Sequence, residues 1–169
     1  MASEGPIVFI TNLKEKLENA GKSQSSKYQK LGQVIKSNVD MENISRFVMG
    51  RYWNIASQEE RKNFLIEYEK HFLKLCANNL HRYMKNSEMI IMSVRKIDNF
   101  SYLINTRLTY NDDELFNISY KVIQKEDSFL ISDIIIAGIS LVINQRTKFG
   151  EKFDSVGIIN TIEELNKQE

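Results

Sequence analysis

Cysteine, proline and histidine are scarce in this sequence, and their scarcity excludes several classes of fold and site. Among 169 residues there is one cysteine (Cys76), one proline (Pro6) and two histidines (His71 and His81). One cysteine cannot form an internal disulfide bond, and two histidines beside it cannot complete a conventional Cys/His zinc site. We therefore predict no metal ligands and no disulfide framework.

Long apolar runs and a strong charge of one sign are also missing. No run of about 18 apolar residues occurs, so no transmembrane helix is predicted. The net charge is +1, which provides no field that would attract nucleic acid. The first residues, MASEGPIVFI, lack the charged and apolar regions of a signal peptide.

The composition that remains is that of a globular domain. Hydrophobic residues make up 42% of the chain and charged residues 27%, and both are ordinary values for a folded protein. A chain of 169 residues suits one domain better than two. We therefore predict a single domain over residues 1–169.

The first half of the sequence has the apolar spacing of α-helices. Helices are predicted over residues 6–20, over residues 28–39 and, as a short third helix, up to Gly50. Ser57 and Glu60 have the spacing of a capping box, which should open the longest helix.

The second half changes to a period of two, which is typical of antiparallel strands with one covered face. Four strands are predicted, over residues 89–97, 100–110, 115–122 and 128–137. Beyond them Ser140 should cap another helix, and Gly157 should separate a final one. The predicted class is α+β, with several helices on one face of a curved four-stranded antiparallel sheet, an arrangement that can leave a pocket between the layers.

Groups that could carry catalysis are few. The sequence has no Gly-x-Ser-x-Gly elbow and no glycine-rich phosphate loop. His71 lies beside the apolar stripe of the longest helix, but no carboxylate is clearly its partner. His81 is expected in solvent, and Cys76 fits a small core residue better than a nucleophile. We predict no catalytic residue.

Two long segments resemble a known family. Residues 50–65 read GRYWNIASQEERKNFL, against a family pattern of Gly-x-Tyr-Trp, then Ala-Ser, then Gln- or Glu-Arg and Phe. Residues 133–149 read DIIIAGISLVINQRTKF, against Asp-Val-x-x-x-Gly-Val-Ser-Leu-Val and then Asn-x-Arg-x-x-Phe. On these segments the chain resembles the MlaC family, also called the toluene-tolerance family. The family usually has Gly-x-Trp before the last strand, where this sequence has Asp127-Ser128-Phe129.

The resemblance implies a periplasmic phospholipid carrier and not an enzyme. It implies a cone-shaped fold like that of nuclear transport factor two, with a lipid-tail cavity between helices and sheet. Phospholipid would be the cargo and no cofactor would be needed. The partners would be an outer-membrane lipoprotein complex and an inner-membrane ABC transporter with an MCE-domain ring, which together maintain outer-membrane lipid asymmetry. We expect the carrier to be a monomer.

On this hypothesis the lipid tails contact large apolar side chains on the facing layers. The helices would contribute Phe47, Trp53, Phe64, Tyr68, Phe72 and Val142, and the strands would contribute Ile104, Leu108, Ile118, Tyr120 and Ile136. Arg146 is predicted either at the mouth of the cavity or as a structural brace that binds Asp133.

Two other functions stay open, because the pattern alone fits a filled hydrophobic core at least as well as a cavity. The first is a small-molecule enzyme on the same cone-shaped fold, for which His71 is the only candidate base. The second is a protein-interaction module with an apolar groove that takes a partner helix.

Overall fold

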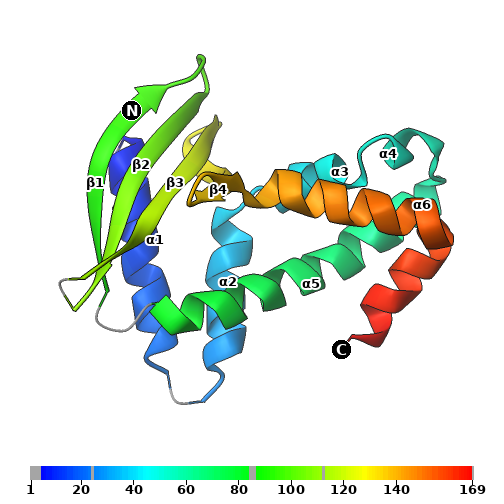
Figure 1. Ribbon diagram of the computed structural model, residues 1–169, viewed down its shortest axis with the longest axis horizontal. Helices are drawn as coiled ribbons and strands as arrows, with labels where there is room; N and C mark the ends of the chain where they lie inside the picture. The colour runs from blue at the N-terminus through cyan, green and yellow to red at the C-terminus, as the bar shows by residue number, and fades with distance from the viewer. Residues whose placement is uncertain (1–4, 24, 84–86, 112, 169) are drawn as a thin grey trace.

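The protein folds into helices and one curved antiparallel sheet (Figure 1). The computed structural model describes residues 5–23, 25–83, 87–111 and 113–168, and the side chains of residues 80–83 and 114–116 lie outside the described part, so the prediction for His81 does too. The helices are α1 (Pro6–Gly21), α2 (Lys27–Asn38), α3 (Met41–Met49), α4 (Tyr52–Ile55), α5 (Gln58–Tyr83) and α6 (Leu141–Lys167). The strands are β1 (Ser87–Lys96), β2 (Ser101–Tyr110), β3 (Asp113–Lys125), β4 (Ser128–Ile136) and β5 (Ile139–Ser140).

The strands form a meander in the order β1-β2-β3-β4-β5. The predicted count of four strands is therefore wrong, because β5 pairs with the end of β4. Ala137 and Gly138 connect them in a tight turn with φ of 50° and 82°. A strand of two residues contains too few positions to alternate, so no period in the sequence could reveal it.

The predicted alternation is confirmed in the middle of the sheet. The even positions Ile104, Thr106 and Leu108 of β2 are buried, and so is Val122 of β3. Phe100 has the same parity but is 63% exposed, because it precedes the first residue of β2.

A bulge in β4 adds a second apolar position to the covered face. Lys121 pairs with Asp133 and the next residue of β3 pairs with Ile131, so Ser132 is an extra residue. Residues that lie opposite each other point to the same face, and for this reason Ile131 and Ile134 both face the helices, opposite Val122 and Tyr120 of β3.

Helices cover one face of the sheet, as predicted. α1 packs on β2, whereas α2, α3 and α6 pack on β4. Figure 1 shows that α5 begins alongside α6, in a part of the molecule built of helices alone, and then passes α2 toward the part that holds the sheet. The half that holds the sheet, α1 and α2 therefore differs in construction from the all-helical half.

A backbone bridge joins the helical layer to the sheet between α2 and α3. Val39 pairs with Ile131 in a parallel bridge, and the Asp40 N–H donates to the Ile131 carbonyl at 2.9 Å. The Asp40 carboxylate is buried and accepts from Lys125 Nζ at 3.0 Å and from Asn43 Nδ2 at 2.9 Å. These partners satisfy a carboxylate that burial would otherwise destabilise.

The predicted helix boundaries are set by local side-chain chemistry. The Ser57 N–H donates to Glu60 Oε1 at 2.8 Å and the Glu60 N–H donates to Ser57 Oγ at 3.1 Å, which confirms the capping box. Ser140 Oγ accepts from the Ile143 N–H at 3.1 Å and caps α6. Gly157 has φ 84° and ψ 170°, and it kinks α6 at the predicted break.

An aromatic core fills the space between α5 and α6. The Phe64 and Tyr68 rings of α5 stack with centroids 5.3 Å apart, and both pack edge-on against Phe149 of α6. The Tyr68 hydroxyl donates to Gln145 Oε1 at 2.9 Å, so this buried polar group is satisfied. His71 packs at the edge of the same core against Tyr68 and Phe149.

We predict that Gly50→Ala destabilises the protein. Gly50 ends α3 with φ 57° and ψ −131°, and an added Cβ would lie 3.1 Å from Arg146 Nε. Backbone strain of this kind costs about 1–3 kcal/mol, which urea unfolding would measure. The control is Gly32→Ala inside α2, where nothing lies within 4 Å of an added Cβ. There alanine should stabilise the helix by about 0.5–1 kcal/mol. Equal effects of the two substitutions would contradict the argument.

We predict that His71 makes folding stability fall in mild acid. Burial, and after it the nearby Lys148 and Lys152, lower the pKa of His71 below its ordinary value of 6.5. The unfolded chain therefore binds a proton that the folded chain resists, so the free energy of unfolding decreases as pH falls below about 6.5. Urea unfolding between about pH 7.5 and pH 5 should show a shallower pH dependence in His71→Gln than in the unmodified protein. Parallel pH profiles would show that His71 is not responsible.

Candidate functional site: an apolar cavity between helices and sheet

The site with the chemistry of a ligand pocket is an apolar cavity of about 110 Å³. It lies between α1, α2 and α5 on one side and strands β1–β4 on the other. Its helical wall consists of Ile10, Leu13, Lys14, Leu17, Ile35, Val39, Phe72 and Cys76. Its sheet wall consists of Met89, Leu108, Ile118, Tyr120, Ile131 and Ile134.

The walls of this cavity are uncharged except at one residue. Burial raises the pKa of the Tyr120 hydroxyl to about 12 and that of the Cys76 thiol to about 12. Both groups are therefore neutral near pH 7. Aliphatic side chains and Phe72 make up nearly all of the remaining lining. The cavity can hold apolar matter without separating charges.

Lys14 is the charged residue of the lining. Its side chain is 25% exposed and forms an ion pair with Glu18 one turn further along α1. Lys14 Nζ also lies 3.4 Å from the Ser87 carbonyl at the start of β1. The ammonium is thus held at the side of the cavity where α1 meets the edge strand and solvent, with the aliphatic stem against the apolar lining.

Four of the predicted lipid-binding residues line the cavity: Phe72, Leu108, Ile118 and Tyr120. Four others are buried in the surrounding core but not among the lining residues: Phe64, Tyr68, Ile104 and Val142. The last four lie at or near the surface: Phe47, Trp53, Ile136 and Arg146. The structure therefore separates the predicted set into a cavity group, a core group and a surface group.

The sequence reasoning missed the contribution of α1 to the cavity. Ile10, Leu13 and Leu17 lie along one side of α1 and face the sheet wall across the cavity. The spacing of these apolar residues in the sequence predicts a helix, but it does not indicate which other element their side of the helix packs against. Ile131 and Ile134 were missed for a different reason, since the bulge in β4 breaks the alternation that would have paired them.

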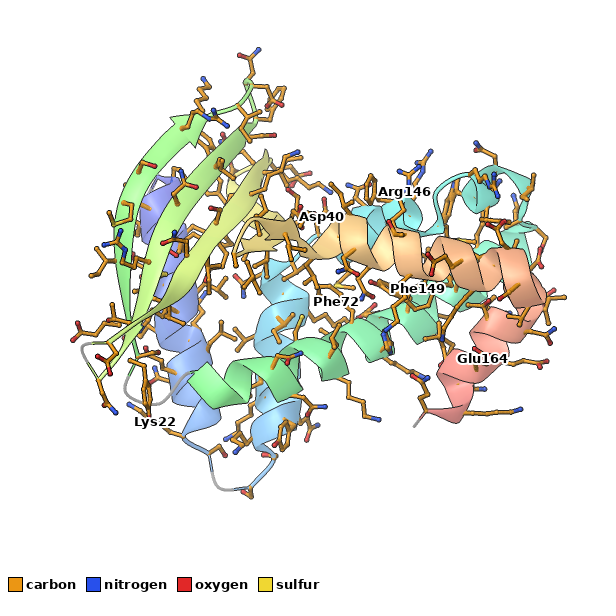
Figure 2. All side chains as sticks on the ribbon, viewed as in Figure 1. Lys22, Asp40, Phe72, Arg146, Phe149 and Glu164 are labelled. Atoms are coloured by element: carbon orange, nitrogen blue, oxygen red, sulfur yellow. The ribbon has the colours of Figure 1, made fainter. Side chains whose placement is uncertain are left out.

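Of the two roles predicted for Arg146, the one that depends on a hydrogen bond to Asp133 is not found, because that bond is not formed. The Asp133 carboxylate instead accepts from the Ser140 hydroxyl and from the N–H groups of Val142 and Ile134. These contacts hold the start of α6 against β4. The Arg146 guanidinium stacks over Phe47 with its carbon 4.6 Å from the ring centroid, and Figure 2 shows it projecting from α6 on the side away from α5.

His71 is separated from the cavity. It is not one of the lining residues. Burial lowers its pKa most, and the side chains that also influence this pKa are three lysines and Gln168, none of which is a carboxylate. Within the described ranges no three His, Cys, Asp or Glu side chains gather closely enough to hold a metal ion. In the same part of the chain no helix is long and apolar enough to cross a membrane.

Comparisons with known proteins agree with this geometry. The model of the family described as "MlaC protein" matches residues 8–167. The solved structure of a phospholipid-binding protein from Ralstonia solanacearum, in complex with a phospholipid, is similar with a TM-score of 0.79 and 17% sequence identity, over 95% of this chain and 96% of that chain. No curated protein sequence matches the chain. At this identity the structural likeness shows a shared fold, and the family match over nearly the whole sequence shows that the chain belongs to the MlaC family.

Proposed function

We propose that this protein binds the acyl chains of a phospholipid in the cavity between α1, α2, α5 and the sheet. The observation that carries the proposal is the lining, in which a single charged side chain accompanies thirteen uncharged ones. An apolar cavity gives an acyl chain contacts with aliphatic groups, as the interior of a membrane does. No arrangement of acid, base and nucleophile converges among these residues, so binding without chemistry is the function that they support.

The energetics of lipid transfer favour such a carrier. Each buried methylene is worth about 0.8 kcal/mol, so a sixteen-carbon chain in water costs on the order of 12 kcal/mol. Unassisted transfer through an aqueous space is therefore very slow. A carrier needs only to match the stabilisation that the membrane provides, and aliphatic walls with Phe72 can do this.

The size of the cavity implies that its walls separate when lipid enters. Ligand pockets usually measure about 300–1,000 Å³, and this cavity measures about 110 Å³. The wall formed by α1 is the one suited to move, because the opposite end of the helical layer is bonded to β4 through Val39 and Asp40. Lys14 would then lie beside the phosphate of a lipid whose headgroup remains at the edge of the cavity.

Family membership together with the cavity supports a carrier role. We place the protein in the periplasm as a monomer that shuttles phospholipid between an outer-membrane lipoprotein complex and an inner-membrane ABC transporter with an MCE-domain ring. The Ralstonia solanacearum protein of the same fold was solved with a phospholipid bound, which supports phospholipid as the cargo. ATP hydrolysis by the transporter would supply direction, since the cavity itself only binds.

The proposed function predicts that phospholipid accompanies the purified protein. Solvent extraction of protein prepared without detergent, followed by mass spectrometry, should yield roughly one phospholipid per chain, because an occupied apolar cavity exchanges slowly with water. Protein that has been unfolded, stripped and refolded should take up labelled lipid from vesicles. A lipid-free extract together with no uptake would show that the cavity is part of a filled core and would refute the proposal.

The proposed function also predicts that a bulky side chain in the cavity prevents phospholipid from binding. Leu108 is 8% exposed and lines the cavity, so Leu108→Trp should fill it and remove most of the bound phospholipid. Overpacking should cost about 1–3 kcal/mol of stability, which thermal melting would monitor. The matched control is Ile66→Trp, at a position on α5 that is 46% exposed and does not line the cavity. Equal lipid content in the two variants would exclude this cavity as the binding site.

A further inference from the structure

An arginine–aromatic patch covers the surface where α3, α4, α5 and α6 meet. We define it as Arg46, Phe47, Trp53, Arg61 and Arg146. The guanidinium carbons of Arg46 and Arg61 lie 5.2 and 5.0 Å from the Trp53 ring centroid, and that of Arg146 lies 4.6 Å from the Phe47 ring centroid. Three cations are therefore held close together on aromatic faces.

The three arginines of the patch have different roles. Arg61 Nε donates to the Trp53 carbonyl at 2.6 Å, so this guanidinium holds the end of α4. Arg46 and Arg146 are exposed, and among the described residues neither forms a hydrogen bond or an ion pair. Both guanidiniums lie over an aromatic ring, and their N–H donors have no partner among the described residues. A purely structural role would not need those donors.

The surface between these arginines is hollowed. A groove of about 330 Å³ is lined by Arg46, Arg146, Phe47 and Trp53, together with Gly50 and two asparagines, and no acidic side chain lines it. A neighbouring groove of about 620 Å³ shares Phe47, Gly50 and Arg146 with the first; Glu151 and Asp154 also line this second groove, and Asp154 forms an ion pair with Arg51. The groove between the two unpaired arginines is therefore positively charged without internal compensation.

The composition of the patch favours a protein partner over a membrane surface. Arginine, tryptophan and phenylalanine are enriched at the energetic centres of protein interfaces, whereas lysine is depleted. No lysine lines either groove. A surface that binds anionic lipid by charge alone has no such preference, because lysine and arginine serve equally there. Stacked guanidiniums also present the planar fork that matches a carboxylate.

We infer that the arginine–aromatic patch is a docking surface for an acidic segment of a partner protein. Two carboxylates of that segment bind Arg46 and Arg146, one on each guanidinium, and an apolar side chain between them covers Phe47 and Trp53. The patch lies on α3–α6 and shares no residue with the cavity lining. Docking here leaves the cavity free to exchange its contents, and the inference does not depend on what the cavity holds.

Trp53 reports directly on this surface, because it is the only tryptophan in the chain. The probe is a short tryptophan-free peptide rich in glutamate and leucine, titrated at low salt against the intact purified protein. We expect a saturable change in Trp53 emission that weakens as salt is added. A peptide in which lysine replaces every glutamate should produce no change.

Paired variants identify the surface involved. Arg46→Gln with Arg146→Gln should weaken peptide binding at least about tenfold, because each charge-assisted hydrogen bond contributes about that factor. The control removes the same charge elsewhere, with Lys16→Gln and Arg95→Gln at exposed positions on α1 and β1, and should bind as the unmodified protein does. Circular dichroism melting verifies the fold of each variant. Arg46→Lys with Arg146→Lys should bind with intermediate strength, because the charge remains but the fork is lost.

Several outcomes would overturn the inference. No emission change with the acidic peptide would mean that the arginines only brace α3 and α6. Equal weakening in the control variant would mean that binding follows net charge alone. If vesicles of phosphatidylcholine and phosphatidylglycerol, or inorganic phosphate, changed Trp53 emission through Arg46 and Arg146 while the acidic peptide did not, the patch would bind phosphate groups instead. None of these results bears on the lipid content of the cavity.

Discussion

The backbone junction between α2 and α3 is the contact on which the arrangement of this protein depends. Val39 and Asp40 bond to Ile131 of β4, and Lys125 of β3 neutralises the buried Asp40 carboxylate. The junction bonds the helical layer to β4, whereas on the other side of the cavity α1 reaches β1 through Lys14 and the Ser87 carbonyl. Val39 and Ile131 also line the cavity. The junction is therefore part of the cavity wall.

The apolar face of the long helix α5 packs in the aromatic core along its first half and lines the cavity further along. Its first half places Phe64 and Tyr68 in the aromatic core against α6, where rings fill the space and a buried hydrogen bond holds Tyr68 to Gln145. Further along, Phe72 and Cys76 face the cavity. Figure 2 shows Phe72 and Phe149 directed into the interior from α5 and α6. One half of the molecule is thus packed with aromatic rings, and the other half contains the cavity.

This division of the fold suits a binding protein better than an enzyme. The described titratable groups of the cavity are kept neutral by burial or, at Lys14, held at the edge beside Glu18. In the all-helical part, by contrast, Arg46 and Arg146 stack on the rings of Trp53 and Phe47 at the surface. On the proposed function, an apolar interior for cargo and a separate arginine–aromatic patch for recognition would allow the protein to exchange cargo while it is bound to a partner.

The sequence alone determined the family and most of the elements, although not the short α4 and β5. Capping chemistry at Ser57 and Ser140, the break at Gly157 and the period-two strands are local properties, and local interactions decide them. The two long motifs identified the family because they extend over many positions. The class of fold, with helices on one face of a curved sheet, followed from these elements.

Only the tertiary structure decided which apolar residues line the cavity. Phe64 and Phe72 lie two turns apart on one stripe and cannot be distinguished by pattern, yet one is packed against α6 and the other lines the cavity. The β4 bulge and the crossing of α1 over the sheet are properties of pairing between distant segments. Burial drives all of these side chains inward alike, and whether they meet a neighbour or a cavity depends on how the layers are held apart.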